Sequence, residues 1–112
     1  MIWRATINNL SRTPAFKKSF KKVSQYPGFK KDKFVYVLNA LMNDEVLPQS
    51  FKDHPMAKVS PKKYQGCRDV HIAPNIVIVY RKSVGDILLI DIGSHQDLQL
   101  TEDFDFLFNM NN

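Results

Sequence analysis

The sequence predicts an α+β fold in which two N-terminal helices pack on one face of an antiparallel sheet. Three observations lead to this prediction: two segments with helical apolar spacing, three strand-like segments after them, and short turns between those strands. Short turns join antiparallel neighbours, because a parallel pair needs a long crossover connection. A chain of 112 residues can bury one modest core, so we expect a single domain over residues 1–112.

The N-terminal part is expected to form a strand and then a helix. Residues 1–7 are rich in strand-forming side chains, and residues 8–12 carry boundary signals. Thr13 followed by Pro14 is typical of a helix N-cap with proline at the first helical position. The turn at residues 26–28 contains Pro and Gly and should end this helix. Its apolar stripe consists of Phe16, Phe20 and Val23.

A second helix is predicted from about Lys30 to Met42, with Asp32 in its first turn. The segment that follows, from Leu47 to Lys63, contains three prolines and should be irregular, because proline interrupts both helices and central strands. The predicted buried face of the second helix consists of Phe34, Val37, Leu38 and Leu41.

The second half of the chain predicts a three-stranded antiparallel meander. Tyr64 to Tyr80 reads as two strands joined by a turn at Ala73-Pro74-Asn75. The run from Ile76 to Tyr80 is β-branched and aromatic, which is typical of a central buried strand. A third strand is expected from Ile87 to Ile92, after a turn that contains Gly85.

Positive charge is concentrated in the N-terminal half of the chain. Residues 1–63 carry 13 basic and 4 acidic side chains, a net charge of +9, whereas residues 64–112 carry 3 and 7, a net charge of −4. A basic region of this strength favours a polyanionic partner such as RNA, DNA or an acidic protein. A solvated helix surface would explain the same pattern equally well.

Cysteine usage and hydropathy indicate a cytoplasmic protein. The single cysteine, Cys67, excludes an internal disulfide and lies in an apolar pattern that predicts burial rather than reactivity. No apolar run approaches the roughly 20 residues of a membrane span, and no signal peptide is evident. We therefore expect no membrane partner.

The chain contains three histidines, His54, His71 and His95, and all of them lie in or beside the expected sheet. Histidine exchanges protons readily near neutral pH. Two imidazoles beside a phosphodiester could remove the proton of a ribose 2′-OH and protonate the departing 5′-oxygen. Arg68 or Arg81 could stabilise the phosphorane between them. This chemistry needs no metal, because the 2′-OH is an internal nucleophile.

Two other interpretations of the histidines remain open at this stage. The three side chains could bind a catalytic zinc ion in a metal-dependent hydrolase, although none of their spacings is the short local kind seen in many zinc sites. Each histidine could instead be structural and hydrogen-bonded to the backbone of a loop.

Four segments form a wider pattern in a fixed order. They are LPQSFKDHP from Leu47 to Pro55, GCRDVHIAP from Gly66 to Pro74, the strand Ile76 to Tyr80, and IGSHQDL from Ile92 to Leu98. Together they resemble the YafQ-type toxins of the RelE superfamily, which are the toxin halves of bacterial type II toxin–antitoxin pairs. The resemblance covers roughly residues 13–98.

The resemblance implies a RelE-like, microbial RNase-type fold and an mRNA endonuclease that acts in the ribosomal A site without a cofactor. It also implies a cognate acidic antitoxin, and operator DNA as a partner only of the toxin–antitoxin complex. The catalytic residues that it implies are His54, Asp69, His71 and His95. Among them His95 would be the proton donor and His54 the better candidate for the base, while His71 and Arg68 would orient and neutralise the phosphate. The expected RNA-binding residues are Lys52, Lys62, Lys63, Arg68 and Arg81.

The chain departs from the family pattern at two positions. Family members often carry an acid directly after the hairpin proline, where this chain has Asn75, and an aromatic residue four positions past the last histidine, where it has Gln99. A carboxamide cannot accept a proton, so these residues support an alternative: a catalytically weak or inactive RelE-fold protein that acts mainly through its antitoxin complex. Residues 98–112 are acidic and aromatic and are expected to form a C-terminal extension.

Overall fold

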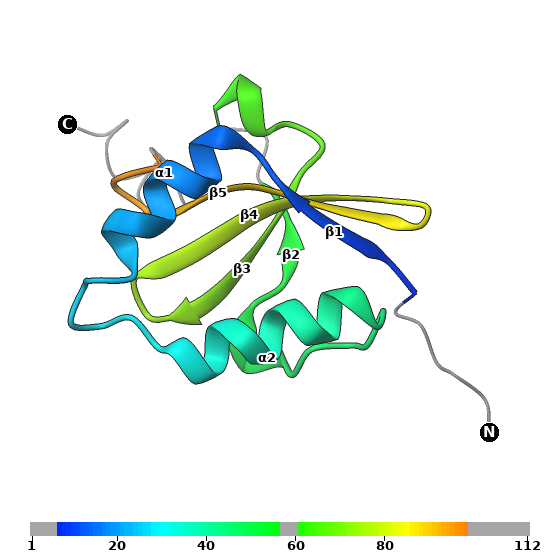
Figure 1. Cartoon of the computed structure of the whole chain (residues 1–112), viewed down its shortest axis with the longest axis horizontal. Coiled ribbons are helices and arrows are strands. Elements are labelled where there is room, and N and C mark those ends of the chain that lie inside the picture. Colours follow the sequence, from blue (N-terminus) through cyan, green and yellow to red (C-terminus); the bar gives the residue numbers. More distant parts are fainter. Residues whose placement is uncertain (1–6, 57–60, 99–112) are drawn as a thin grey trace, which may run out of the picture.

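The computed structural model describes residues 7–56 and 61–98 of the chain. Two helices pack against a five-stranded sheet whose strands lie in the order β1-β5-β4-β3-β2 (Figure 1). The predicted α+β fold is therefore confirmed. The elements are β1 (Asn9–Arg12), α1 (Pro14–Val23), α2 (Lys31–Met42), β2 (His54–Pro55), β3 (Arg68–Ala73), β4 (Ile76–Ser83) and β5 (Asp86–Gly93).

The first strand differs from the prediction. β1 occupies residues 9–12, which were predicted to be a boundary, while residues 1–6 of the predicted strand lie outside the described residues. β1 is mostly exposed and pairs with a single neighbour, β5, so its polar sequence suits a sheet edge. Its pairing with β5 is parallel, which makes the sheet mixed rather than purely antiparallel. The chain between these two strands supplies the long crossover that a parallel pair requires.

Both predicted helices are confirmed. Thr13 caps α1, because its Oγ1 accepts a hydrogen bond from the Phe16 N–H at 3.0 Å. The same hydroxyl donates to the carbonyl oxygen of Ile90 in β5 at 2.6 Å, which attaches the start of the helix to the sheet. The helices bury Phe16 and Val23 of α1 and Val37, Ala40 and Leu41 of α2.

The meander of β3, β4 and β5 is antiparallel, as predicted. β4 is the central strand, and it is buried from Ile76 to Tyr80. Successive side chains point to opposite faces of a strand, so each face of the sheet buries its own cluster. The helix-covered face carries the main core, with Val70 of β3 and Ile78 of β4. The opposite face carries a smaller cluster of Tyr64, Cys67, Val77, Val79 and Leu98.

The proline-containing segment after α2 is largely irregular, as predicted. It forms two short 3-10 helices, η1 (Gln49–Phe51) and η2 (Lys62–Tyr64), with the two-residue strand β2 between them. β2 was not predicted, but Pro55 is compatible with a strand that lies at the edge of a sheet. Residues 57–60 and the expected extension from residue 99 onward lie outside the described residues. Within the described part, no helix has the length and apolar character needed to span a membrane.

Candidate active site

His54 and Asp69 form an ion pair across the first two strands of the site. They lie directly opposite each other in the β2–β3 pairing, and Nε2 of His54 is 2.8 Å from Oδ1 of Asp69. The Asp69 side chain is 8% exposed, whereas the His54 side chain is 50% exposed. Nδ1 of His54 lies 2.8 Å from the carbonyl oxygen of Pro55. Both ring nitrogens of His54 therefore face oxygen atoms, one from the Asp69 carboxylate and one from the Pro55 carbonyl.

His71 and His95 form a second pair further along the same face. His71 is two residues after Asp69 on β3, and its ring centroid lies 5.0 Å from that of His95 in an edge-to-face arrangement. Asp69 and His71 pair with Val79 and Val77, which belong to the cluster on the face away from the helices. The structure therefore brings all the histidines to that face of the sheet, on three different segments.

The turn that carries His95 is fixed by reciprocal hydrogen bonds. The Ser94 N–H donates to Oδ2 of Asp97 at 3.2 Å, and the Asp97 N–H donates to the Ser94 hydroxyl at 2.9 Å. The Tyr26 hydroxyl donates to the same carboxylate at 3.2 Å. These bonds, above all the one from the Ser94 backbone, lower the pKa of Asp97 although partial burial opposes them. The loop that presents His95 is thus held in one conformation.

Replacing Gly93 by alanine should disturb this turn. A Cβ at Gly93 would lie 3.0 Å from Cβ of Asp97 and 3.4 Å from Cδ2 of Leu98, so the turn that carries His95 must adjust to accommodate it. We expect the free energy of unfolding to fall by about 1 kcal/mol, and any reaction that uses His95 to slow by about 10-fold or more. Rates of RNA cleavage and urea unfolding test this. Gly28→Ala is the control, since a Cβ there meets no atom within 4 Å; equal activity of the two variants would contradict the role of Gly93.

Arg68, which was predicted to help neutralise the phosphate, alternates with Asp69 on β3 and is held by Asp53 and Tyr80. Its Nε donates to Oδ1 of Asp53 at 3.2 Å and to the Tyr80 hydroxyl at 3.3 Å, and that hydroxyl donates to Asp53 at 2.7 Å. Tyr80 belongs to the core under the helices, so this network lies toward the opposite face of the sheet. Burial opposes the charge of Arg68, but the hydrogen bond with Tyr80 and the charge of Asp53 outweigh it and raise its pKa.

Asp53 was not singled out by the sequence, although it precedes His54 in the FKDHP motif. Its carboxylate ties this segment to β3 through Arg68 and to β4 through Tyr80. The network therefore positions the segment that carries His54, and the charge of Arg68 is balanced within it.

Two buried tyrosines should make the fold sensitive to alkaline pH. Tyr64 and Tyr80 are at most 2% exposed, and their hydroxyls donate to Asp91 and Asp53. Burial raises the pKa of both phenols and is the larger cause. The neighbouring carboxylate raises it further, from Asp91 for Tyr64 and from Asp53 for Tyr80. A phenol whose pKa is raised by folding stabilises the folded protein at pH values below its unfolded pKa of 10.0. This stabilisation is lost as the pH rises above 10.0.

We therefore expect the free energy of unfolding to fall above pH 10 by about 1.4 kcal/mol per pH unit for each buried phenol. Urea unfolding between pH 8 and pH 11 measures this slope. Tyr64→Phe should reduce the slope, whereas Tyr36→Phe, at a residue that is 48% exposed, should leave it unchanged. A slope that is identical in all three proteins would rule out this origin.

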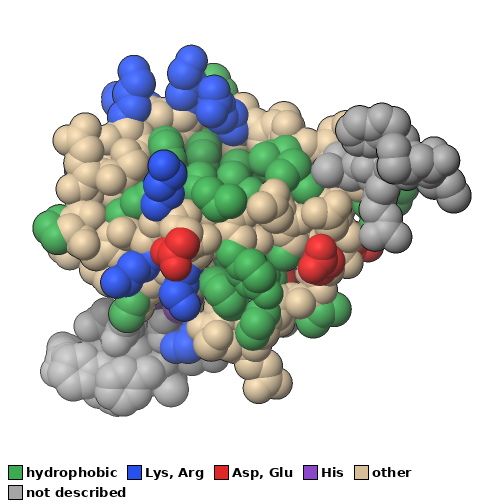
Figure 2. All heavy atoms as spheres, turned by 60° about the horizontal axis from the view of Figure 1, so that its bottom comes forward, with side chains coloured by type: hydrophobic (Ala, Val, Ile, Leu, Met, Phe, Trp, Pro, Cys, Tyr) green, Lys and Arg blue, Asp and Glu red, His purple; other side chains and the backbone are tan. Residues whose placement is uncertain are grey.

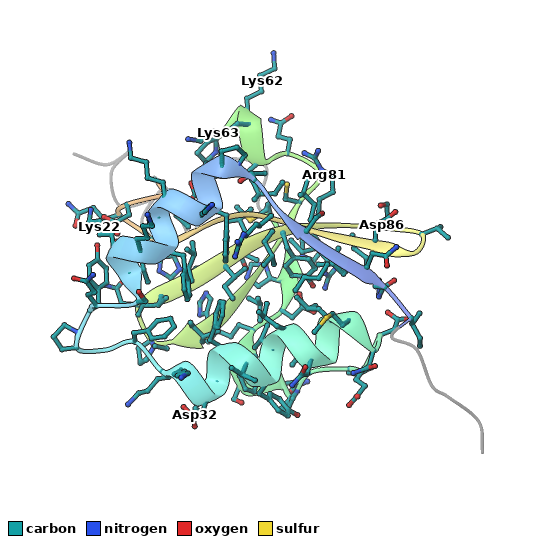
Figure 3. All side chains as sticks on the ribbon, viewed as in Figure 1. Lys22, Asp32, Lys62, Lys63, Arg81 and Asp86 are labelled. Atoms are coloured by element: carbon teal, nitrogen blue, oxygen red, sulfur yellow. The ribbon has the colours of Figure 1, made fainter. Side chains whose placement is uncertain are left out.

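The other predicted RNA-binding residues lie at two places. Lys62 and Lys63 stand on η2 at the top of Figure 3, and Arg81 projects from β4 on the same side of the molecule. Nζ of Lys63 lies 5.0 Å from the Tyr64 ring centroid, and Nη2 of Arg81 lies 3.6 Å from Sγ of Cys67. These contacts place both cations beside the cluster on the histidine-bearing face. Lys52 is exposed and lies directly after η1.

The donor groups do not favour a metal centre. Within residues 7–56 and 61–98, no three His, Cys, Asp or Glu side chains are arranged so that they could hold a metal ion. The zinc-dependent alternative therefore has no ligand set in the part of the chain that the structure describes.

Two helices on one face of a five-stranded mixed sheet define the class of RelE-like toxin folds. The family model described as "Bacterial toxin of type II toxin-antitoxin system, YafQ" matches residues 8–100, and the chain belongs to this family of toxins. A comparison with curated protein sequences finds no match. The matched range contains the four residues predicted to be catalytic: His54, Asp69, His71 and His95.

Similar solved structures come from two bacteria. A copper-bound mutant toxin from Helicobacter pylori is 28% identical, has a TM-score of 0.70, and the match covers 81% of this chain and 98% of that chain. The E. coli DinJ-YafQ toxin-antitoxin complex gives a match of 26% identity and TM-score 0.67 over 82% of this chain and 97% of that chain. YafQ from E. coli strain BL21(DE3) is 24% identical, has a TM-score of 0.68, and the match covers 81% of this chain and 97% of that chain. At this identity the match supports the fold alone.

Proposed function

We propose that this type II toxin is a cytoplasmic, ribosome-dependent mRNA endonuclease that cuts RNA through the ribose 2′-OH without a metal. The observation that carries the proposal is the contact between His71 and His95, whose ring centroids are 5.0 Å apart. At this separation, one nitrogen of each ring can lie within about 3 Å of two different oxygens of a single phosphate. Acid–base cleavage of RNA requires such an arrangement.

The reaction would proceed by transfer within the RNA chain. One imidazole removes the 2′-OH proton, the 2′-oxygen bonds to phosphorus, and the bond from phosphorus to the 5′-oxygen breaks. His95, as the family resemblance implies, would donate a proton to that leaving oxygen. The products are a 2′,3′-cyclic phosphate and a 5′-hydroxyl, and no water or cofactor is consumed.

The contacts of His54 favour a charge-stabilising role over the role of base that its sequence motif predicts. Both of its ring nitrogens lie 2.8 Å from oxygen atoms of Asp69 and Pro55, so neither is directed at a 2′-OH in this arrangement. As a half-exposed side chain on the same face as the second pair, its protonated form would stabilise negative charge on the phosphorane. His71 is then the candidate base, with His95 as the acid.

The expected partners follow from family and charge. The E. coli relative occurs in a structure of a toxin–antitoxin complex, which supports a cognate antitoxin for this chain. The net charge of +9 over residues 1–63 favours an acidic antitoxin, and it equally suits ribosomal RNA and the message. Operator DNA would be bound only by the toxin–antitoxin complex. The chain would act as a single toxin domain, with residues 98–112 as an extension of it.

Induced expression tests the proposal. We expect growth arrest and messages that are cut on ribosomes. Co-expression of an acidic protein encoded in the neighbouring reading frame should restore growth. Arrest with intact messages would instead favour the catalytically inactive binding protein. One feature of the structure favours that alternative: the exposed turn after β3 presents the carboxamide of Asn75 where related toxins often carry an acid.

A further inference from the structure

A hollow of about 340 Å³ adjoins His71 of the histidine pair. It lies between the start of α2, η1 and the end of β3, and His71 forms part of its wall. Its charged lining consists of Lys30, Lys33 and Lys52, and no Asp or Glu among residues 7–56 and 61–98 lines it. The hollow is therefore positively charged and borders His71, a candidate catalytic residue.

A larger hollow, of about 730 Å³, lies on the other side of Lys52 and has a different charge balance. His54 and Arg68 line it, but so do three carboxylates, from Asp44, Glu45 and Asp53. These acids offset the cations there, so the smaller hollow is the better site for an anion.

Lys33 of the smaller hollow lies over an aromatic ring that also lines it. Nζ of Lys33 lies 5.5 Å from the ring centroid of Phe51, a buried residue that also lines the hollow. Asp32, in the same helical turn, points away from the molecule at the lower edge of Figure 3. Figure 2, in which the α2 side is turned forward, shows Lys and Arg side chains gathered over the left half of that face.

Lys52 has an unusual backbone conformation at this place. Its φ of 51° and ψ of 44° lie in the left-handed region, which glycine and asparagine adopt more easily than lysine does. Its side chain borders both hollows and so lies between the surroundings of His54 and those of His71.

We propose that this hollow binds a backbone phosphate of the RNA strand next to the scissile phosphate, through Lys30, Lys33 and Lys52. The proposal rests on the proposed endonuclease function, in which the scissile phosphate lies at His71 and His95. Binding of an adjacent phosphate positions the strand without reading its sequence. The hollow would therefore set which linkage reaches the imidazoles.

The test measures binding of a short single-stranded RNA that carries a 2′-deoxy nucleotide at the cleaved position, by fluorescence anisotropy of the full chain. K30A/K33A is compared with K17A/K18A, which removes the same charge from the exposed side of α1. We expect K30A/K33A to lose at least 10-fold in RNA affinity and the control to lose less than about threefold. The affinity of K30A/K33A should also depend less steeply on salt concentration. Equal losses in the two double variants would overturn the proposal.

Neutral methylphosphonate linkages locate the phosphate. One linkage beside the cleaved position should weaken binding to the unmodified protein but not to K30A/K33A. If every neutral linkage weakens binding to both proteins equally, the hollow does not bind a phosphate.

Lys52→Asn should raise or maintain the melting temperature while binding weakens about fivefold; unchanged binding would also count against the site. Message cleavage by the unmodified protein is followed separately, so failure of the proposed endonuclease is distinguishable from failure of this phosphate site.

Discussion

Replacing His95 by alanine is expected to lower message cleavage by about 10² to 10⁴-fold and to abolish growth arrest. The leaving 5′-oxygen would then lose its proton donor, and a positioned general acid contributes an effect of this size. The fold should survive, because the His95 side chain is only partly buried and the turn is held by Ser94 and Asp97. Primer extension on ribosome-bound message measures cleavage, and urea unfolding measures stability.

Gln96→Ala is the matched control for this prediction. Gln96 is exposed and adjoins His95 in the same turn, so its loss should change neither cleavage nor stability. Cleavage that persists within about threefold in the His95→Ala protein would remove this residue from the reaction. A comparable loss in both variants would mean that the turn as a whole, rather than the imidazole, is required.

Separating His54 from Asp69 should produce the second large effect. Asp69→Asn removes the buried carboxylate that holds the His54 ring, so we expect stability to fall by about 1–3 kcal/mol and cleavage to fall by about 10²-fold. A double-mutant cycle with His54→Ala should give a coupling energy of about 1–2 kcal/mol, because the two side chains are 2.8 Å apart and Asp69 is 8% exposed.

The ion pair between Lys82 and Asp44 provides the comparison for that cycle. Both side chains are nearly half exposed, so their coupling energy should be below about 1 kcal/mol. His54→Arg adds a test of role, since a cation at this place should retain part of the activity if His54 stabilises charge. Complete inactivity of the arginine variant, with the fold intact, would instead indicate that His54 transfers a proton.

Much of the fold could be predicted because the decisive signals are local. Thr13 and Pro14 mark the start of α1, and the run from Ile76 to Tyr80 identifies the central strand. β1 and β2 could not be found in this way. β1 is a polar edge strand, and β2 has only two residues, so both are defined by pairing with distant strands rather than by their own sequence.

The histidines of the site could be predicted from residue type and motif, but their partners could not. Arg68 and Asp69 are adjacent in sequence, yet strand alternation turns them to opposite faces of the sheet. Arg68 shares its strand face with Val70, which is buried under the helices, and this alternation is a sequence signal that would have separated Arg68 from Asp69 and His71. The engagement of both nitrogens of His54 depends on the β2–β3 register, which no local pattern specifies.

The chemistry of the cut ends tests the central claim most directly. A message is cleaved on ribosomes by the purified toxin, and the termini of the two fragments are identified; a second message carries a 2′-deoxy nucleotide at the cleaved position. Acid–base cleavage through the 2′-OH predicts fragments that end in a 2′,3′-cyclic phosphate and a 5′-hydroxyl. It also predicts no cleavage of the deoxy message. Fragments with a 5′-phosphate, or cutting of the deoxy message, would contradict it.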